Sequence, residues 1–166
     1  MWPASGTWGS LPPVMVFAGM AWLSSPSWSH VVVQVALTVA ASVGCIRHGG
    51  KVERATGRKD PGLVVIDEVA GMALTLAIMV PLVVWLDGRG STFLQPLPTS
   101  LAAWLAAGAF VWFRAMDVIK PPPARGLQSL AGGVGVLVDD LVVGPYAAAG
   151  CVACLWFFLR HLQPAG

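Results

Sequence analysis

The amino-acid sequence predicts an all-α integral membrane protein, with residues 1–166 forming a single membrane-embedded domain. Hydrophobic residues make up 56% of the chain, the mean hydropathy is +0.72, and only 11% of the residues are charged. Ordinary soluble domains carry roughly 25% charged residues. The chain also contains several long apolar segments. Together these observations exclude a disordered tail, a disulfide-stapled secreted module and a basic nucleic-acid binder, and they argue strongly against a soluble enzyme, whose surface needs more charge.

We predict about four to five transmembrane or re-entrant helices, joined on one side of the membrane by two charged cytoplasmic loops. The apolar segments that predict these helices are residues 11–23, 31–46, 69–86, 101–116 and 142–159. A helix needs about 20 apolar residues to cross a hydrocarbon core of about 30 Å, and the third and fifth segments come close to that length. Segment 11–23 contains Pro12, Pro13 and Gly19, and both a full crossing and a re-entrant piece stay open for it. Residues 1–10 carry no basic side chain, so we do not expect a signal peptide.

The positions of the charges predict the orientation of the helices. Of the 18 charged residues, nine lie between Arg47 and Glu68 and six between Arg114 and Asp140. If the N-terminus is cytoplasmic and all five segments cross, loops 47–68 and 117–141 face the cytoplasm. Those loops, together with Arg114, hold eight of the ten Lys and Arg residues, as the positive-inside rule requires. Interfacial tryptophans are expected near the predicted outer ends: Trp22, Trp28, Trp85 and Trp104.

Polar residues inside the apolar segments are few. Gln34, Thr38 and Ser42 are spaced four residues apart, which predicts a polar stripe that packs against another helix; a stripe that lines a ligand site is the alternative. Cys151 and Cys154 have C-x-x-C spacing but lie inside an apolar segment without a second pair, Cys45 lies in another apolar segment, and the three histidines are scattered. They indicate neither a zinc site nor a histidine-based catalytic centre.

Six of the eight carboxylates form three groups where a charged loop meets an apolar segment. These residues are Asp60, Asp67 and Glu68, then Asp117, then Asp139 and Asp140. Charged side chains near lipid are costly and usually mark a functional site, and hard oxygen ligands suit Mg²⁺. The alternative is helix capping, because the pairs 67–68 and 139–140 each precede a predicted helix, where negative charge is favourable.

Basic residues and glycine-rich turns accompany the acids. Arg114, Asp117 and Lys120 are spaced three residues apart, so they can lie along one face of a helix end. Arg114 and Lys120 are suited to hold a phosphate group; ion pairing at a helix end is the other interpretation. The turns at residues 6–11 and 132–135 offer backbone amides that can cradle an anion.

Taken together, these blocks resemble the phosphatidylglycerophosphatase A family. The similar stretches occur in the family's order and are GTWGSL (6–11), Asp60 followed by IDEVAGM (66–72), FRAMDVIKPPP (113–123) and GGVGVLVDD (132–140). The resemblance implies a Mg²⁺-dependent lipid phosphatase of the bacterial cytoplasmic (inner) membrane that converts phosphatidylglycerophosphate to phosphatidylglycerol. Ser5 stands where the family commonly has Pro, and Ala131 where some members have a polar residue, so the rigidity of these two turns is in question.

From these observations we assign roles to the residues as a hypothesis. The predicted ligands of one or two Mg²⁺ ions are Asp60, Asp67, Glu68, Asp117, Asp139 and Asp140. The predicted catalytic residues are Asp67, Glu68, Asp117, Asp139 and Asp140. The predicted contacts with the substrate phosphate are Thr7, Ser10, Arg114, Lys120 and Gly133. The nucleophile is either an activated water or an aspartate.

The expected partner is the membrane phospholipid substrate, without nucleic acid, and the oligomeric state stays open. The alternative function is a cation transporter or channel that uses the clustered carboxylates. Against it, the acids gather at one predicted membrane face, whereas transporters more often bind near the midplane.

Overall fold

The computed structural model describes residues 5–23, 28–57, 65–86, 99–127, 130 and 133–162. Within these ranges the chain is helical and contains no strand. The helices are α1 (Ser5–Leu23), α2 (Trp28–Thr56), α3 (Ile66–Leu86), α4 (Thr99–Ile119), the short α5 (Ala124–Leu127) and α6 (Gly133–Leu162). The predicted all-α fold is confirmed.

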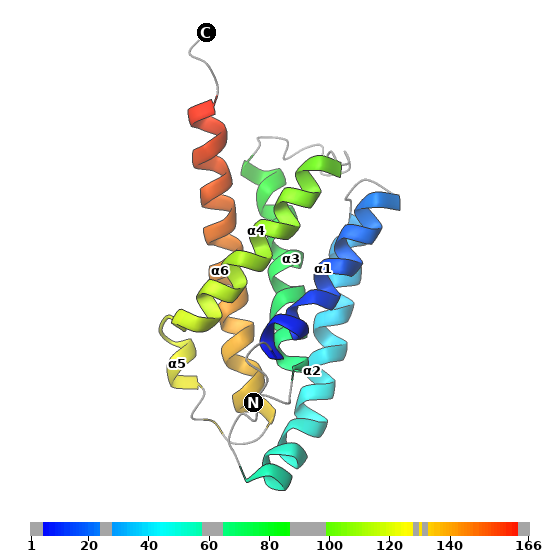
Figure 1. Cartoon of the computed structure of the whole chain (residues 1–166), viewed down its shortest axis with the longest axis vertical. Helices are drawn as coiled ribbons and strands as arrows, with labels where there is room; N and C mark the ends of the chain where they lie inside the picture. Colours follow the sequence, from blue (N-terminus) through cyan, green and yellow to red (C-terminus); the bar gives the residue numbers. More distant parts are fainter. Residues whose placement is uncertain are drawn as a thin grey trace.

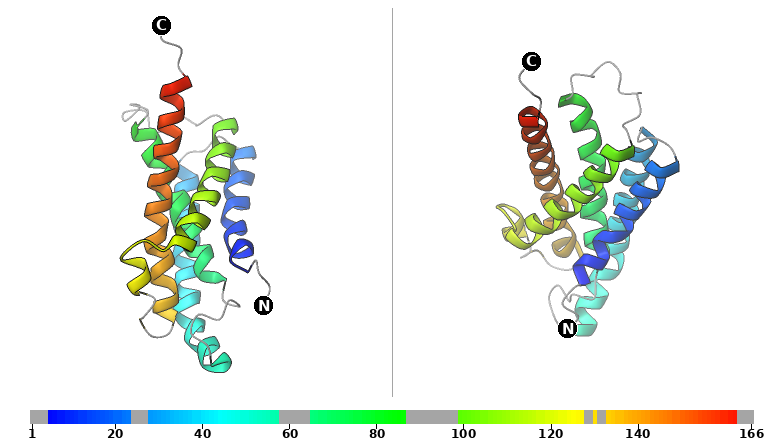
Figure 2. Two further views of the ribbon diagram at one scale, coloured as in Figure 1. Left: turned by 60° about the vertical axis from the view of Figure 1, so that its left-hand side comes forward. Right: turned by 45° about the horizontal axis from the view of Figure 1, so that its top comes forward.

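The five long helices run alternately up and down in one bundle (Figure 1). Helix α3 contacts α1, α2, α4 and α6, and α5 packs against α6. The first residues of α1, α3 and α6 and the last residues of α2 and α4 all lie toward the lower end of the bundle in Figure 1, and the two turned views agree (Figure 2). We call this the charged end, because the described parts of both charge-rich windows of the sequence lie there.

Within the described residues, four helices are long and apolar enough to cross a membrane: Trp28–Val52, Ile66–Trp85, Ala102–Ile119 and Gly133–Phe158. Side chains such as Phe17, Met72, Leu105 and Phe113 are fully or almost fully buried between the helices. Many large apolar side chains point outward instead, as expected for surfaces in contact with lipid. The predicted tryptophans at the opposite end are exposed: Trp22, Trp28, Trp85 and Trp104. The chain therefore has the features of a multi-pass membrane protein.

Helices α1, α2 and α6 are longer than predicted. Residues 6–11 were predicted as a glycine-rich turn, but they lie in α1, which begins at Ser5. The first charge-rich window was predicted as a loop, but α2 continues into it as far as Thr56. Gly49 and Gly50 disfavour a helix by up to about 1 kcal/mol each, but a Cβ at Gly49 would lie only 2.9 Å from the Cα of Gly133. The absence of a side chain at Gly49 therefore permits the close packing of α2 and α6.

Helix α6 starts at Gly133 rather than near residue 142. The predicted glycine-rich turn is thus partly the first turn of this helix. Asp139 and Asp140 lie inside α6, more than one turn from its start, so helix capping does not explain them. Asp67 and Glu68 do lie in the first turn of α3, where negative charge is favourable.

Gln34, the first residue of the predicted polar stripe on α2, contacts α1. Gln34 is fully buried, and its Nε2 donates a hydrogen bond to the backbone oxygen of Pro13 at 3.1 Å. The hydroxyl of Thr38 donates to the backbone oxygen of Gln34 at 2.9 Å. Pro12 and Pro13 lie within α1, and the Gln34 side chain ties this stretch of α1 to α2.

Candidate active site

The first turn of α3 meets the first turns of α1 at the charged end. Asp67 is 6% exposed and Glu68 is half-buried. A Cβ at Gly6 would lie 2.6 Å from Oε1 of Glu68 and 2.7 Å from the Arg114 guanidinium, and a Cβ at Gly9 would lie 2.7 Å from Oε2 of Glu68. The two glycines therefore let α1 approach the Glu68 carboxylate and the Arg114 guanidinium more closely than any residue with a side chain would allow.

The end of α4 adds a row of alternating charges. A guanidinium nitrogen of Arg114 lies 2.8 Å from the Asp117 carboxylate, whose other oxygen lies 3.7 Å from Nζ of Lys120. The three-residue spacing of these residues thus places their side chains next to one another, as predicted. Asp117 is the shared partner of both cations.

Lys120 adopts an unusual backbone conformation just after the helix. Its φ angle is +46°, a left-handed conformation that glycine adopts most easily at the end of a helix. The Lys120 amide donates to the backbone oxygen of Met116 at 2.7 Å. The backbone of Lys120 is therefore strained, and strained residues with a side chain often occur at functional sites.

The Lys120 side chain connects α4 to α6. Its Nζ donates a hydrogen bond to Oδ2 of Asp139 at 2.6 Å. Burial alone would lower the pKa of Lys120, but the hydrogen bond to Asp139 and the charges of Asp139, Asp140 and Asp117 outweigh burial, so this pKa is raised. Lys120 is therefore a firmly protonated cation between two carboxylates.

The acidic pair of α6 is almost completely buried, with Asp139 at 3% and Asp140 at 2% exposure. The charges that act on Asp140 belong to Asp117, Asp67, Asp139 and Lys120. Close packing of α3 on α6 contributes to this gathering, because a Cβ at Gly71 would lie 2.8 Å from the backbone oxygen of Asp140. The structure thus brings together residues from three helices that are far apart in sequence.

We call this group the acid cluster and define it as Asp67, Glu68, Asp117, Asp139 and Asp140 with Arg114 and Lys120. Five carboxylates and two cations leave a formal charge of −3 when all are ionised. Buried charge of one sign is costly unless an ion of opposite sign compensates it. The charge and the oxygen donors of the cluster therefore fit a hard divalent cation such as Mg²⁺.

Within the described ranges, however, no three His, Cys, Asp or Glu side chains are grouped closely enough to hold a metal ion. Lys120 lies between Asp117 and Asp139. The predicted ligand Asp60 lies outside the described residues. The donor chemistry thus fits a metal, while the described residues do not form an assembled coordination sphere.

The other predicted phosphate contacts lie at different places. Ser10 is buried, and its hydroxyl donates to the backbone oxygen of Gly6 at 2.9 Å, so it faces its own helix. Thr7 is half-buried one residue beyond Gly6. Gly133 lies against α2, where Sγ of Cys45 donates to its backbone oxygen at 3.5 Å. The roles of Thr7, Ser10 and Gly133 in phosphate binding stay predictions.

The sequence reading assigned no role to two residues that support the cluster. Gly71 permits the contact between α3 and α6, and the hydroxyl of Tyr146 on α6 donates to the backbone oxygen of Pro122 at 3.0 Å. Small residues in apolar helices are a general signal of close packing, and that signal points to Gly71. No sequence signal points to the hydrogen bond of Tyr146, because its partner is a backbone oxygen on another segment.

The fold and the cluster define a class of protein: a multi-pass helical membrane protein with a buried acidic and basic site at one end of its bundle. Comparison with known proteins shows which family this is. The family model described as phosphatidylglycerophosphatase A matches residues 1–155. The chain belongs to the phosphatidylglycerophosphatase A family, a family of phosphatases.

Individual relatives agree with this assignment. The chain is 32% identical over 162 residues to phosphatidylglycerophosphatase A of Escherichia coli (strain K12), covering 97% of this chain and 77% of the relative. It is 30% identical over 158 residues to phosphatidylglycerophosphatase A of Haemophilus influenzae (strain Rd), covering 95% and 82%. It is also 28% identical over 153 residues to a putative phosphatidylinositol-3-phosphatase of Bacteroides thetaiotaomicron, covering 92% and 84%. No solved structure matches the chain.

Proposed function

We propose that this protein hydrolyses phosphatidylglycerophosphate to phosphatidylglycerol and phosphate, with Mg²⁺, at the cytoplasmic face of a bacterial inner membrane. The observation that carries the proposal is the acid cluster, in which buried carboxylates of α3 and α6 and the half-buried Asp117 of α4 gather with two cations at one end of a membrane bundle. The named relatives from E. coli and H. influenzae supply the substrate.

The depth of the cluster suits a substrate that is anchored in the bilayer. A Cβ at Gly44 of α2 would lie 2.7 Å from the side chain of Ile66, the first residue of α3. Gly49 of α2 lies against Gly133, the first residue of α6. Helices α3 and α6 therefore begin at the level of residues 44–49 of α2. Asp140 lies seven residues beyond Gly133, or about 10 Å further along α6. The cluster thus lies within about two helical turns of the level at which α3 and α6 begin, so the substrate phosphate has to enter the bundle from the headgroup layer while its acyl chains stay in the membrane.

The cations of the cluster are suited to bind the phosphate. Arg114 offers a planar guanidinium and Lys120 a point charge, and both are fixed by Asp117. Hydrolysis forms one P–O bond from water and breaks the ester P–O bond, while charge on the phosphoryl oxygens is stabilised by these cations. A carboxylate of the cluster accepts a proton from the attacking water and delivers it to the glycerol oxygen, which leaves as a hydroxyl.

Mg²⁺, when bound, would supply further charge stabilisation and a more acidic water. We propose that its ligands come from Asp67, Glu68, Asp117, Asp139 and Asp140, with Asp60 from the segment before α3. The negative charge of the cluster and its oxygen donors support this proposal.

The test is release of phosphate from phosphatidylglycerophosphate by the purified protein in mixed micelles, with Mg²⁺ and with a chelator. We expect Asp67→Asn and Asp140→Asn to reduce turnover by at least about a hundredfold, as loss of one electrostatic catalytic group does. Glu53→Gln makes the same chemical change outside the cluster and should keep near-normal activity. Lack of phosphate release from folded protein with Mg²⁺, or normal activity in both Asp variants, would refute the proposal.

The relative from Bacteroides provides a second substrate for the same assay. It is named a putative phosphatidylinositol-3-phosphatase, so phosphatidylinositol 3-phosphate should be tested beside phosphatidylglycerophosphate. We expect the glycerol phosphomonoester to be preferred, because the two relatives at 30% identity or above are both named for it. Faster release from the inositol lipid would assign the other substrate.

A further inference from the structure

The outward face of α2 carries a continuous apolar stripe. Five large apolar side chains are between 39% and 63% exposed: Val32, Val35, Val39, Val43 and Ile46. Their spacing of three or four residues places them on one side of the helix. In a membrane protein such a stripe faces the acyl chains of the lipid.

Basic residues follow the apolar stripe within one turn of the helix. The row with four-residue spacing that contains Val39 and Val43 continues with Arg47 and Lys51, and Arg54 follows three residues later. All three basic side chains are exposed. Residues two apart in a helix point in nearly opposite directions, so Gly49, which packs against α6, lies on the face opposite Arg47.

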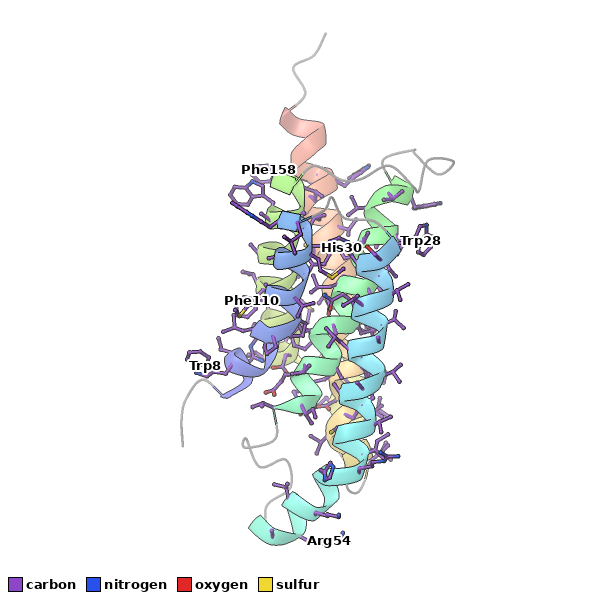
Figure 3. The ribbon with its side chains drawn as sticks, turned by 90° about the vertical axis from the view of Figure 1, so that its right-hand side faces the viewer. Trp8, Trp28, His30, Arg54, Phe110 and Phe158 are labelled. Atoms are coloured by element: carbon purple, nitrogen blue, oxygen red, sulfur yellow. The ribbon has the colours of Figure 1, made fainter. Side chains whose placement is uncertain are left out.

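The length of α2 places this change at a membrane boundary. Trp28, which is 45% exposed, and Arg54 lie at opposite ends of the helix (Figure 3). The 19 residues from Trp28 to Arg47 extend about 29 Å, which matches the hydrocarbon core of about 30 Å. Trp28 therefore marks one boundary and Arg47 the other.

The rest of the helix extends through the headgroup region. Arg54 lies seven residues beyond Arg47, or about 10 Å along the axis, and the headgroup layer on each side is about 5–8 Å thick. Lys51 and Arg54 are thus at the depth of the lipid phosphates and just beyond. The positive-inside rule requires only that basic residues lie on one side of the membrane. It does not require them to lie on the same face of a helix as the lipid-facing apolar residues.

We propose that Arg47, Lys51 and Arg54 form a binding surface for the headgroups of anionic phospholipids. The partner is a lipid that bears net negative charge. Its headgroup contacts the three cations, and its acyl chains contact the apolar stripe. Charge complementarity and the unbroken row from Val39 to Lys51 carry the inference. The surface lies on α2, whereas the acid cluster lies on α3, α4 and α6.

Lipid selectivity can be measured without any assay of activity. The protein is reconstituted in phosphatidylcholine bilayers with a trace of spin-labelled phosphatidylserine or spin-labelled phosphatidylcholine, and electron spin resonance gives the immobilised fraction of each. Each Lys or Arg near an anionic surface contributes up to about a fivefold preference. We expect wild-type protein to favour phosphatidylserine several-fold, and Lys51→Gln/Arg54→Gln to lose most of this preference.

Two controls separate the surface from general charge effects. Lys51→Arg/Arg54→Lys keeps both charges and should keep the selectivity. Arg160→Gln removes a charge near the C-terminal end of α6 and should leave selectivity unchanged. High salt should weaken the preference of the wild type, because screening shortens the range of exposed charges.

Three results would overturn the proposal: equal immobilisation of the two lipids by wild type, full selectivity in the double Gln variant, or an equal loss in Arg160→Gln. Elution of each variant as a single species in detergent shows that it is folded. Because the readout is lipid selectivity, failure of this proposal is distinguishable from failure of the proposed phosphatase activity.

Discussion

Replacement of Lys120 by Gly and by Ala separates two roles that the structure combines at one residue. The side chain of Lys120 holds Asp139 at 2.6 Å and lies 3.7 Å from Asp117, while its backbone has a φ angle of +46°. Both substitutions remove the ammonium group. Only Gly removes the backbone strain, because it lacks a Cβ.

The magnitudes follow from burial and conformation. The Asp139 side chain is 4% exposed and that of Lys120 20%, and removal of one partner from a buried pair costs about 3–5 kcal/mol. A left-handed conformation costs about 1–2 kcal/mol for a residue with a Cβ. We therefore expect Lys120→Ala to lose about 3 kcal/mol of stability and Lys120→Gly about 1–2 kcal/mol.

Thermal melting in detergent ranks stability, and phosphate release measures activity. The expected pattern is that Lys120→Gly is more stable than Lys120→Ala while both lose activity to the same extent, and that Lys120→Arg keeps most of the stability. If activity instead recovers together with stability in Lys120→Gly, the ammonium group has no part in the reaction. Wild-type stability in Lys120→Ala would refute the argument from the buried pair.

Two other changes test the packing around the cluster. Gly71→Ala should destabilise the fold by about 1–3 kcal/mol through overpacking, because the new Cβ would lie 2.8 Å from the Asp140 backbone oxygen. Gly19→Ala is the control: a Cβ at Gly19 would have no atom within 4 Å, so this variant should be neutral or slightly stabilised in the same melting assay. Tyr146→Phe removes the 3.0 Å hydrogen bond to Pro122; we expect a loss of about 0.5–1 kcal/mol and a modest loss of turnover, and an unchanged enzyme would show that this bond does not hold the segment after Lys120.

Much of the fold follows from the sequence because the apolar segments are separated by polar or proline-containing stretches. The centre of each long helix falls inside a predicted segment, and the last residues of α1 and α3 coincide with the predicted ends at 23 and 86, whereas the other helix ends lie outside the predicted segments. Helix α6 extends nine residues before the predicted start at 142, because Asp139 and Asp140 interrupt the apolar pattern although they are buried. A hydropathy pattern cannot identify a charged residue that is buried because other helices surround it.

The composition of the site was predictable and its geometry was not. The predicted carboxylates and cations, apart from Asp60, are gathered at one end of the bundle. The sequence cannot show that Lys120 contacts Asp139, 19 positions away, because a pair between two helices depends on their rotation. Gly6 and Gly9 were predicted to lie in a turn that offers backbone amides to an anion, but they lie in helix α1, where the absence of a side chain leaves room for the Glu68 side chain.

The charge balance of the acid cluster leads to one more prediction, on stability in the absence of substrate. Asp140 is 2% exposed and lies among three other carboxylates, so repulsion in the metal-free protein should be relieved by Asp140→Asn, with a gain of about 0.5–2 kcal/mol. Mg²⁺ should stabilise the wild type, by about 2.7 kcal/mol at a hundredfold excess over its dissociation constant, and should stabilise the variant much less. Melting curves with Mg²⁺ and with a chelator measure both effects, and Glu53→Gln is the control. If the wild type melts at the same temperature in both conditions, the negative charge of the cluster does not bind the cation. The fold would then be stable although this buried negative charge is not compensated by a metal ion.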